Sequence, residues 1–323
     1  METVLVGSEV ARVDGLAKVR GTAIYGDDIQ LKDMLYGVCR YVDIAAGRVD
    51  SVDLSEAEKV PGVVHIATWK DIPGQRKLGV IIPDYPPIIE NEVAYRGDVI
   101  AVVAAESYQA ACLAVDKIKL TYSPCEPITS PEEALKPGAR LIHSSLESNV
   151  INRHHTVKGD IEAGFAASTK IIERDYEVGF QEHAYIEPES ITAWLDDDQQ
   201  IMTIAGSIQN AHRIRGIVAK YLDLPQSKVN VKRSVLGGSF GGKDDIIDNL
   251  ACRAALLVQL TGRPVKMTYN REQSMRESYK RHPYKLHYRI GLDDDARIQA
   301  MQINIIADGG SYAGQTVFVT WRS

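Results

Sequence analysis

The chain has 323 residues, of which 45% are hydrophobic and 25% charged, a balance typical of a globular protein with a sizeable core. Its 43 acidic residues outnumber the 37 basic ones, and the net charge of −6 argues against a nucleic-acid-binding surface. No apolar run approaches the ~20 residues that a membrane helix needs, and the first residues lack the basic and apolar regions of a secretion signal.

The first part of the chain alternates short strands with short helices. Apolar and β-branched runs predict strands at residues 35–42, 63–68, 98–104 and 118–122. Helical spacing predicts helices at residues 55–60 and 108–115, the second with Ser107 as its N-cap. The mixture indicates an α+β domain over residues 1–125.

A loop-rich stretch, residues 126–158, follows this domain and contains Pro127, Pro131 and Pro137, which is typical of a linker. The pair His154-His155 lies in it without a further ligand at zinc spacing, which favours solvated side chains over a metal site. The four cysteines form no Cys-x-x-Cys pair, so neither zinc nor an iron–sulfur cluster is predicted for this chain. Scattered thiols indicate a reducing, cytoplasmic location.

Residues 159–323 predict a second domain of strands and helices. Strands are predicted at residues 171–178, 201–204, 229–236, 265–269, 281–290 and 298–306, and helices at residues 158–166, 212–220 and 245–260. Asp160 is the expected N-cap of the first helix. His282 stands before a proline at a strand start, which favours a packing role.

Three carboxylates lie close together in residues 181–189. Glu182, Glu187 and Glu189 stand among apolar neighbours and are candidate acid/base groups. A solvated turn around Pro188 is the simpler interpretation, and no catalytic role is assigned to them.

A glycine-rich loop joins the buried strand predicted at residues 229–236 to the helix predicted at residues 245–260. Its glycines are Gly237, Gly238, Gly241 and Gly242. A loop of this kind turns backbone N–H groups toward its mouth, and the helix dipole favours anionic groups there. The pattern therefore predicts an oxygen-rich ligand, with a glycine-rich turn that binds nothing as the alternative.

The same loop fits two other known motifs in part. Gly237-x-x-x-x-Gly242-Lys243 is a P-loop except that Asp244 replaces the serine or threonine that meets magnesium. Ser239 lies in a Gly-x-Ser-x-Gly nucleophile elbow, which needs an acid and a histidine downstream. The residues after Ser239 are too few for the remaining strands of that hydrolase fold.

The sequence Gly-Gly-Ser-Phe-Gly-Gly-Lys, followed by an acid, resembles the pterin loop of the molybdenum hydroxylases, the xanthine dehydrogenase and aldehyde oxidase family. The opening run at residues 12–28, from Arg-Val-Asp-Gly to Tyr-Gly-Asp-Asp, is similar to the opening of the family's large subunit. Further matches, in the family's order, are Ser-Ile-Gln-Asn at 207–210, Arg-His-Pro at 281–283 and Asp-Gly-Gly-Ser-Tyr at 308–312. The resemblance covers the whole chain.

This resemblance implies a fold and a set of site residues. The fold would be α+β, with an α/β hammerhead domain at residues 1–125, the linker at 126–158, and a truncated first molybdopterin-binding domain at 159–323. By the same resemblance, Gln209 is catalytic and donates from its amide to an oxygen on molybdenum. Gly238, Phe240 and Gly241 bind the cofactor, and Phe240 with Asp244 contacts the substrate. No side chain of this chain is expected to be a metal ligand.

The resemblance also implies a reaction, which is hydroxylation of an N-heterocycle such as a purine or nicotinate, or of an aldehyde, with oxygen from water. The cofactor would be molybdopterin, in its dinucleotide form, with molybdenum. Iron–sulfur clusters and FAD would lie on partner subunits. Purine-hydroxylating relatives carry glutamate where this chain has Asp244, which predicts weak use of xanthine.

The family's large subunit is longer than this chain. Its second half carries an Arg-x-Phe-Gly-x-Pro-Gln segment and a Gly-x-Gly-Glu segment with the general base, and neither occurs here. The resemblance therefore implies a truncated or split subunit that needs a second molybdopterin-domain polypeptide and is inactive alone. The alternative is a catalytically inert relic or assembly fragment of the same fold.

Overall fold

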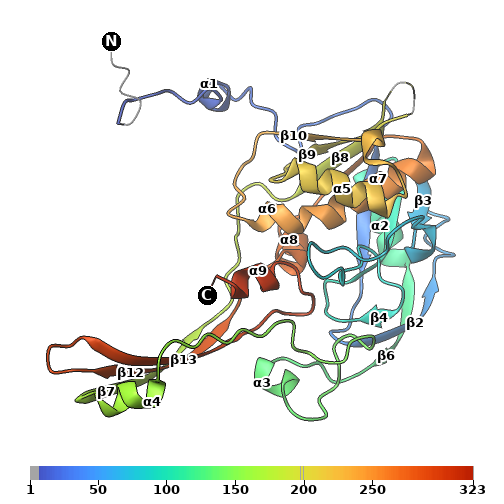
Figure 1. Ribbon diagram of the computed structural model, residues 1–323. Helices are drawn as coiled ribbons and strands as arrows, with labels where there is room; N and C mark the ends of the chain where they lie inside the picture. The colour runs from blue at the N-terminus through green and yellow to red at the C-terminus, as the bar shows by residue number, and fades with distance from the viewer. Residues whose placement is uncertain (1–6, 197, 199, 323) are drawn as a thin grey trace.

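The computed structural model describes residues 7–196, 198 and 200–322. They form a compact body, a long three-stranded arm, and an N-terminal segment with the short helix α1 (Gly15–Val19) that projects from the body (Figure 1). Among these residues, no helix is both long and apolar enough to cross a bilayer.

The body is built on a seven-stranded mixed sheet with strand order β10-β9-β8-β11-β1-β5-β3. Its strands are β1 (Leu35–Tyr41), β3 (Val63–Ala67), β5 (Val99–Ala105), β8 (Ser190–Leu195), β9 (Met202–Gly206), β10 (Val229–Arg233) and β11 (Val265–Thr268). β1 pairs in parallel with β11, with Leu35 opposite Val265. One sheet therefore joins strands from both ends of the chain, and the domain limits given above stay a prediction.

Helices cover both faces of this sheet. α7 (Ile247–Thr261) packs on one face, and its residues 247–258 are all buried, so it is a core helix. α5 (Ala211–Tyr221) packs beside α7, and α2 (Tyr108–Lys117) covers the opposite face. Along β5, Val102 belongs to the core around α7 and Val103 to the core around α2. Successive side chains of a strand point to opposite faces, so β5 is buried on both.

Smaller elements complete the body. β2 (Gly47–Asp53), β4 (Glu92–Val93) and β6 (Lys119–Pro124) form a three-stranded sheet. The remaining short helices of the body are η1 (Trp69–Asp71), α3 (Pro131–Ala134), η2 (Gln226–Lys228), α6 (Gly242–Asp245), α8 (Arg271–Glu277) and α9 (Thr316–Thr320).

The arm is a separate antiparallel sheet with strand order β13-β12-β7. Its strands are β7 (Lys170–Val178), β12 (Tyr284–Leu292) and β13 (Ile298–Ala307), and α4 (Ile161–Ala166) packs beside it. Figure 1 shows the arm extending well away from the body, with its red and green strands side by side.

Most predicted elements are present, and both predicted N-caps are confirmed. The Ser107 side chain accepts from the Ala110 N–H, and Asp160 accepts from the first turn of α4. The helix predicted at residues 55–60 is wrong, because that stretch forms turns between β2 and Pro61 and is too short to propagate a helix. The strand predicted as buried at residues 229–236 is the sheet-edge strand β10, in which only Val229 is buried.

Candidate functional site

The glycine loop follows β10 and ends at α6, which α7 continues. Phe240 stands at its tip with 77% of its surface exposed and a φ of 51°. A bulky residue in the left-handed region is strained by roughly 1–3 kcal/mol, and such strain clusters at functional sites. The flanking Gly238 and Gly241, at φ 103° and 99°, let the chain turn sharply on either side.

The loop presents a row of free backbone donors. Within the described residues, no hydrogen bond is made by the N–H groups of residues 238–241. Their neighbours are satisfied, because the Gly242 N–H donates to the Ser239 carbonyl and the Lys243 N–H to the Ser239 hydroxyl. Consecutive free N–H groups beside a left-handed turn form a concave site for oxygen-rich ligands.

Gln209 is joined to this loop. It follows β9 and precedes Asn210, the N-cap of α5. Its side-chain oxygen accepts a hydrogen bond from the Ser239 hydroxyl, and its backbone N–H donates to the Lys243 carbonyl at 3.1 Å. Its amide nitrogen has no partner among the described residues, so this N–H₂ group is available for a ligand beside the glycine loop.

A buried ion pair holds the loop from behind. Lys243 has no exposed surface, and its Nζ lies 2.7 Å from Oε2 of Glu187 and 4.5 Å from the centre of the Tyr185 ring. The Glu187 carboxylate also accepts from the N–H groups of Gly237, at 2.7 Å, and Gly26, at 3.2 Å. Burial lowers the pKa of Lys243, although Glu187 opposes this shift by favouring the charged form.

The contacts of Lys243 and Ser239 exclude two of the sequence interpretations of this loop. A P-loop lysine must reach its phosphates, whereas Lys243 points into the protein and is paired there. The nucleophile-elbow interpretation fails as well, because the Ser239 hydroxyl donates to Gln209 and, within the described chain, to no histidine. Nothing in the local sequence links Lys243 to Glu187, which lies 56 residues earlier.

The solvated-turn interpretation of the three glutamates is also wrong. Glu189 is fully buried and accepts from the Tyr185 hydroxyl. Glu182 pairs with Lys280 and accepts from the Ser278 hydroxyl at 3.0 Å. Each carboxylate therefore has protein partners that fix its position.

Asp244 lies on the side of the loop that faces α5. The Arg213 guanidinium is bracketed by three carboxylates, at 3.9 Å from Asp244, 2.9 Å from Asp248 and in direct contact with Asp245. Burial raises the pKa of Asp245 and Asp248, although Arg213 opposes this shift. Asp245, rather than Asp244, lines the neighbouring cavity, and the substrate role of Asp244 stays a prediction.

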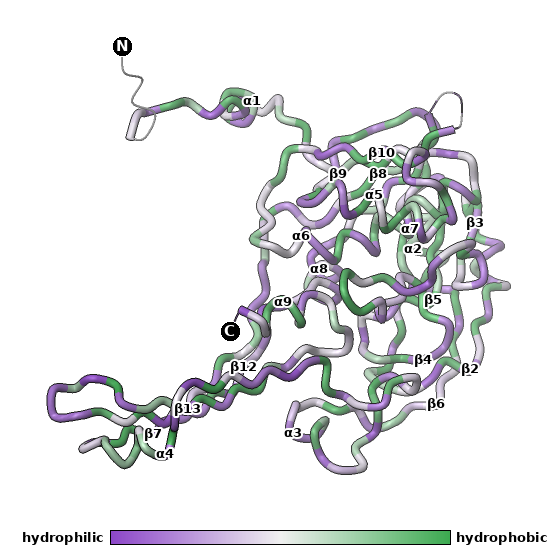
Figure 2. The backbone as a smooth tube through the Cα atoms, viewed as in Figure 1, coloured by the Kyte–Doolittle hydropathy of each residue, from purple (hydrophilic) through white to green (hydrophobic). Residues whose placement is uncertain are grey.

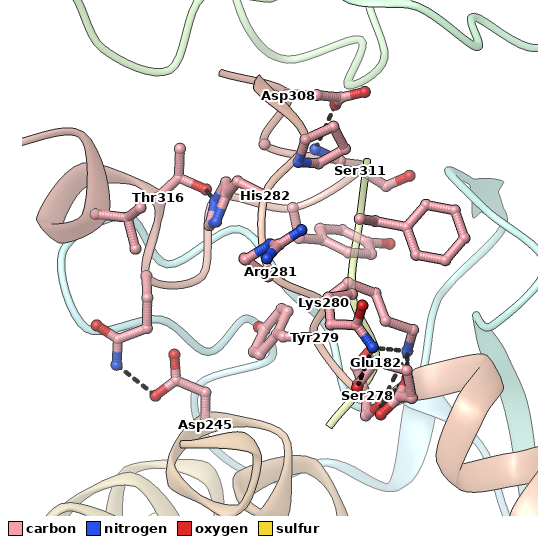
Figure 3. Close-up of a pocket in the computed structure, with 18 of the residues that line it drawn as sticks. Glu182, Asp245, Ser278, Tyr279, Lys280, Arg281, His282, Asp308, Ser311 and Thr316 are labelled. Atoms are coloured by element: carbon pink, nitrogen blue, oxygen red, sulfur yellow. Dashed lines mark hydrogen bonds and ion pairs between the residues drawn. The ribbon is translucent and has the colours of Figure 1, made fainter. Parts of the chain in front are cut away.

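That cavity has a volume of about 810 Å³ and opens beside Phe240 and Gly241. Figure 3 shows its wall, which is formed by the segment from Ser278 to His282 and by the loop that leads to Thr316. His282 is hydrogen-bonded to the Thr316 hydroxyl at 2.8 Å, and burial lowers its pKa. Within the described residues, no group of three or more histidine, cysteine or carboxylate side chains is placed to hold a metal ion.

Comparison with known proteins matches both parts of the chain. Residues 20–126 match the a/b hammerhead domain of aldehyde oxidase and xanthine dehydrogenase, and residues 142–323 match the molybdopterin cofactor-binding domain. The chain belongs to the molybdenum hydroxylase family. The α+β fold, with a hammerhead domain followed by a molybdopterin-binding domain, is thereby confirmed.

The similar proteins include two dehydrogenase subunits and an aldehyde oxidoreductase. The chain is 39% identical to a probable xanthine dehydrogenase subunit of Bacillus subtilis, over 94% of this chain and 40% of that protein. It is 37% identical to the nicotinate dehydrogenase large molybdopterin subunit of Eubacterium barkeri, over 99% of this chain and 74% of that protein. The aldehyde oxidoreductase of Desulfovibrio gigas superposes with a TM-score of 0.88 at 28% identity, over 94% of this chain and 34% of that one.

The residues present fit a molybdopterin group. Its oxygen-rich, anionic skeleton suits the free N–H groups of residues 238–241 and the free amide of Gln209, which donate hydrogen bonds without adding charge. These donors line one side only, and the chain spans less than half of the Bacillus relative.

Proposed function

We propose that this chain forms one wall of the active site of a xanthine dehydrogenase-like hydroxylase. The reaction is hydroxylation of an N-heterocycle such as a purine or nicotinate, or of an aldehyde, with water as the oxygen source. The observation that carries the proposal is the set of free donors at residues 238–241 and Gln209, gathered around the exposed ring of Phe240. In this proposal residues 1–125 are the hammerhead domain, 126–158 the linker and 159–323 the first molybdopterin-binding domain.

Bound molybdopterin would supply the redox-active metal for the oxidation. The role of this chain is to hold the cofactor and to polarise it. The N–H groups of Gly238 and Gly241 donate to the cofactor, as does the amide of Gln209, which the Ser239 hydroxyl orients. Phe240 packs beside the cofactor or the substrate.

Asp244 bears on which substrate is used. The family resemblance implies glutamate at this place in purine-hydroxylating members. Aspartate is one methylene shorter, so its carboxylate is set back by about 1.5 Å. We expect weak use of xanthine and better use of another N-heterocycle or an aldehyde. Efficient xanthine turnover that is lost in Asp244→Ala would contradict this expectation.

The remaining components belong to partners. We propose a dinucleotide form of molybdopterin, a second molybdopterin-domain polypeptide, and iron–sulfur and FAD subunits, in a cytoplasmic complex. The word "subunit" in the names of the Bacillus and Eubacterium relatives supports such an assembly. Because the donors line one side of the site, the isolated chain is expected to be metal-free and inactive.

The test is Gln209→Ala in the enzyme purified from its own cells with all of its partners. Removal of one preorganised donor should lower turnover by about 10²-fold. Molybdenum content, measured by elemental analysis, should stay the same. Gln226→Ala, at an exposed position away from the loop, is the matched control. Unchanged turnover of Gln209→Ala with molybdenum in place would remove this residue from the site.

The alternative is a catalytically inert fragment of the same fold. It predicts that the complex purified from its own cells holds no molybdenum and oxidises no member of a panel of purines, pyridines and aldehydes. Near-stoichiometric molybdenum together with turnover would exclude it.

A further inference from the structure

One face of the arm is apolar except for Arg174, which lies opposite Tyr288 in the middle strand. In the register of β12, Leu286 lies opposite Tyr176 and Ile305, and Ile290 lies opposite Ile172 and Met301. Residues directly opposite one another point to the same face. The Tyr176 and Tyr288 rings meet edge to face at 5.8 Å, which confirms that they share this face. We call it the apolar arm face, and it comprises Ile172, Tyr176, Leu286, Tyr288, Ile290, Met301, Ile303 and Ile305.

The opposite face is polar and already has partners. His287 bonds to Asp175 at 2.7 Å and lies 3.1 Å from Glu173. The Arg289 guanidinium stacks over the Phe165 ring of α4 at 4.2 Å. Of the described elements, α4 is the one helix that packs closely on the arm, and it covers this polar face (Figure 1).

The apolar arm face is exposed, by contrast. Tyr176 is 55% exposed, Met301 42%, Ile303 41% and Ile305 40%. In Figure 2 the strands of the arm carry hydrophobic residues in a part of the molecule that stands clear of the body. Large apolar side chains gathered on one exposed face mark an interaction site.

Its size indicates that the occupant extends beyond the arm. Three strands spaced by about 4.8 Å over about eight residues present roughly 400 Å². A stable interface takes about 800 Å² from each partner, so the arm supplies about half. The arm continues into the cavity beside the glycine loop, because Tyr284, at the start of β12, lines that cavity. Phe180, which is 68% exposed and lies two residues beyond Val178 of β7, lines it too.

We propose that the apolar arm face docks the polypeptide that corresponds to the rest of the relatives' molybdopterin subunit. This inference rests on the proposed function and names the surface that its partner uses. The continuity of the face with the cavity favours this occupant, because one polypeptide then covers the arm and closes the site opposite the glycine loop. The relatives carry enough additional chain, since this one spans 40% of the Bacillus protein and 34% of the Desulfovibrio protein. A second copy of this chain would bring only a second glycine loop, and the side of the site opposite the first loop would still be open.

The experiment is site-specific photo-cross-linking in the enzyme's own cells. Benzoylphenylalanine replaces Ile303 on the apolar arm face in one strain. In the matched control strain it replaces Gln302, the next residue, whose partner in the register is Arg289 on the polar face. Cross-linked peptides are sequenced by mass spectrometry.

The probe at Ile303 should link to a peptide homologous to the rest of the relatives' molybdopterin subunit, and the probe at Gln302 should not. Links from Ile303 to a second copy of this chain, or no links at all, would overturn the proposal. Ile303→Lys should reduce co-purification of the linked polypeptide at least tenfold, whereas Gln302→Lys should leave it intact. Equal losses for both variants would also count against the proposal.

This outcome is independent of the catalytic proposal. Cross-links as expected, with unchanged turnover in Gln209→Ala, would leave the docking surface standing and remove the catalytic assignment. Cross-links to a second copy of this chain, with turnover lost in Gln209→Ala, would do the reverse.

Discussion

The buried Asp98, which is hydrogen-bonded to a residue of the cavity wall, should make the stability of the protein depend on pH. It is fully buried immediately before β5, where its carboxylate accepts from the N–H groups of Ala94 and Tyr95 and from the Tyr312 hydroxyl at 2.7 Å. Tyr312 lines the cavity. Burial raises the pKa of Asp98 to about 7, although these three donors oppose the shift. Asp98→Asn keeps the shape of the side chain and removes the titration.

The sign of the effect follows from proton linkage. Below the ordinary value of 3.8, Asp98 is protonated in the folded and unfolded chains alike. Between about pH 4 and pH 7 the unfolded chain releases this proton while the folded chain keeps it, so the free energy of unfolding falls as pH rises. At 1.36 kcal/mol per pH unit, the loss between about pH 5 and about pH 8 is roughly 2.5 kcal/mol.

The assay is urea denaturation of both proteins across this pH range. Between about pH 5 and about pH 8, the free energy of unfolding of the wild type should fall by about 2.5 kcal/mol relative to that of Asp98→Asn. Asp116→Asn, at an exposed position of α2, controls for the loss of one negative charge. Parallel profiles for the wild type and Asp98→Asn would refute the reasoning, because they would mean that Asp98 is ionised in the folded chain throughout the range.

Three further predictions concern buried or strained positions. Lys243→Met should lower the free energy of unfolding by about 3 kcal/mol in urea denaturation, because Glu187 loses its buried partner. The control variant Lys32→Met, at an exposed position, should change it by less than about 0.5 kcal/mol. Arg253→Met should lower the free energy of unfolding by about 3–5 kcal/mol in the same assay, because the buried Glu277 carboxylate loses its cationic partner. A loss below about 1 kcal/mol would show that the core tolerates this carboxylate without Arg253. Gly238→Ala should lower the free energy of unfolding by about 2 kcal/mol and should lower molybdenum occupancy in the assembled enzyme. The reason is that the added Cβ would lie 2.9 Å from the Cβ of Tyr185, at a φ of 103°. The control Gly216→Ala, within α5, should instead raise the free energy of unfolding by about 0.5–1 kcal/mol.

The sequence by itself determined the features that depend on neighbouring residues. The glycine loop between β10 and α7, and the N-caps Ser107 and Asp160, are local patterns, and the structure has each where it was predicted. The family was also readable, because its motifs are short runs in a fixed order. A weak local signal failed at residues 55–60, where the stretch before Pro61 turns instead of forming a helix.

Only the tertiary structure decided which side chains meet. Lys243 follows the loop glycines in a motif that points such a lysine at a ligand, yet it is buried against Glu187 from a distant segment. The apolar arm face exists only because β7, β12 and β13 pair in one register, and a shift by one residue would turn its side chains to the opposite face. Local periodicity says which residues are apolar, but the direction of a side chain and its distant partner depend on how the whole chain packs.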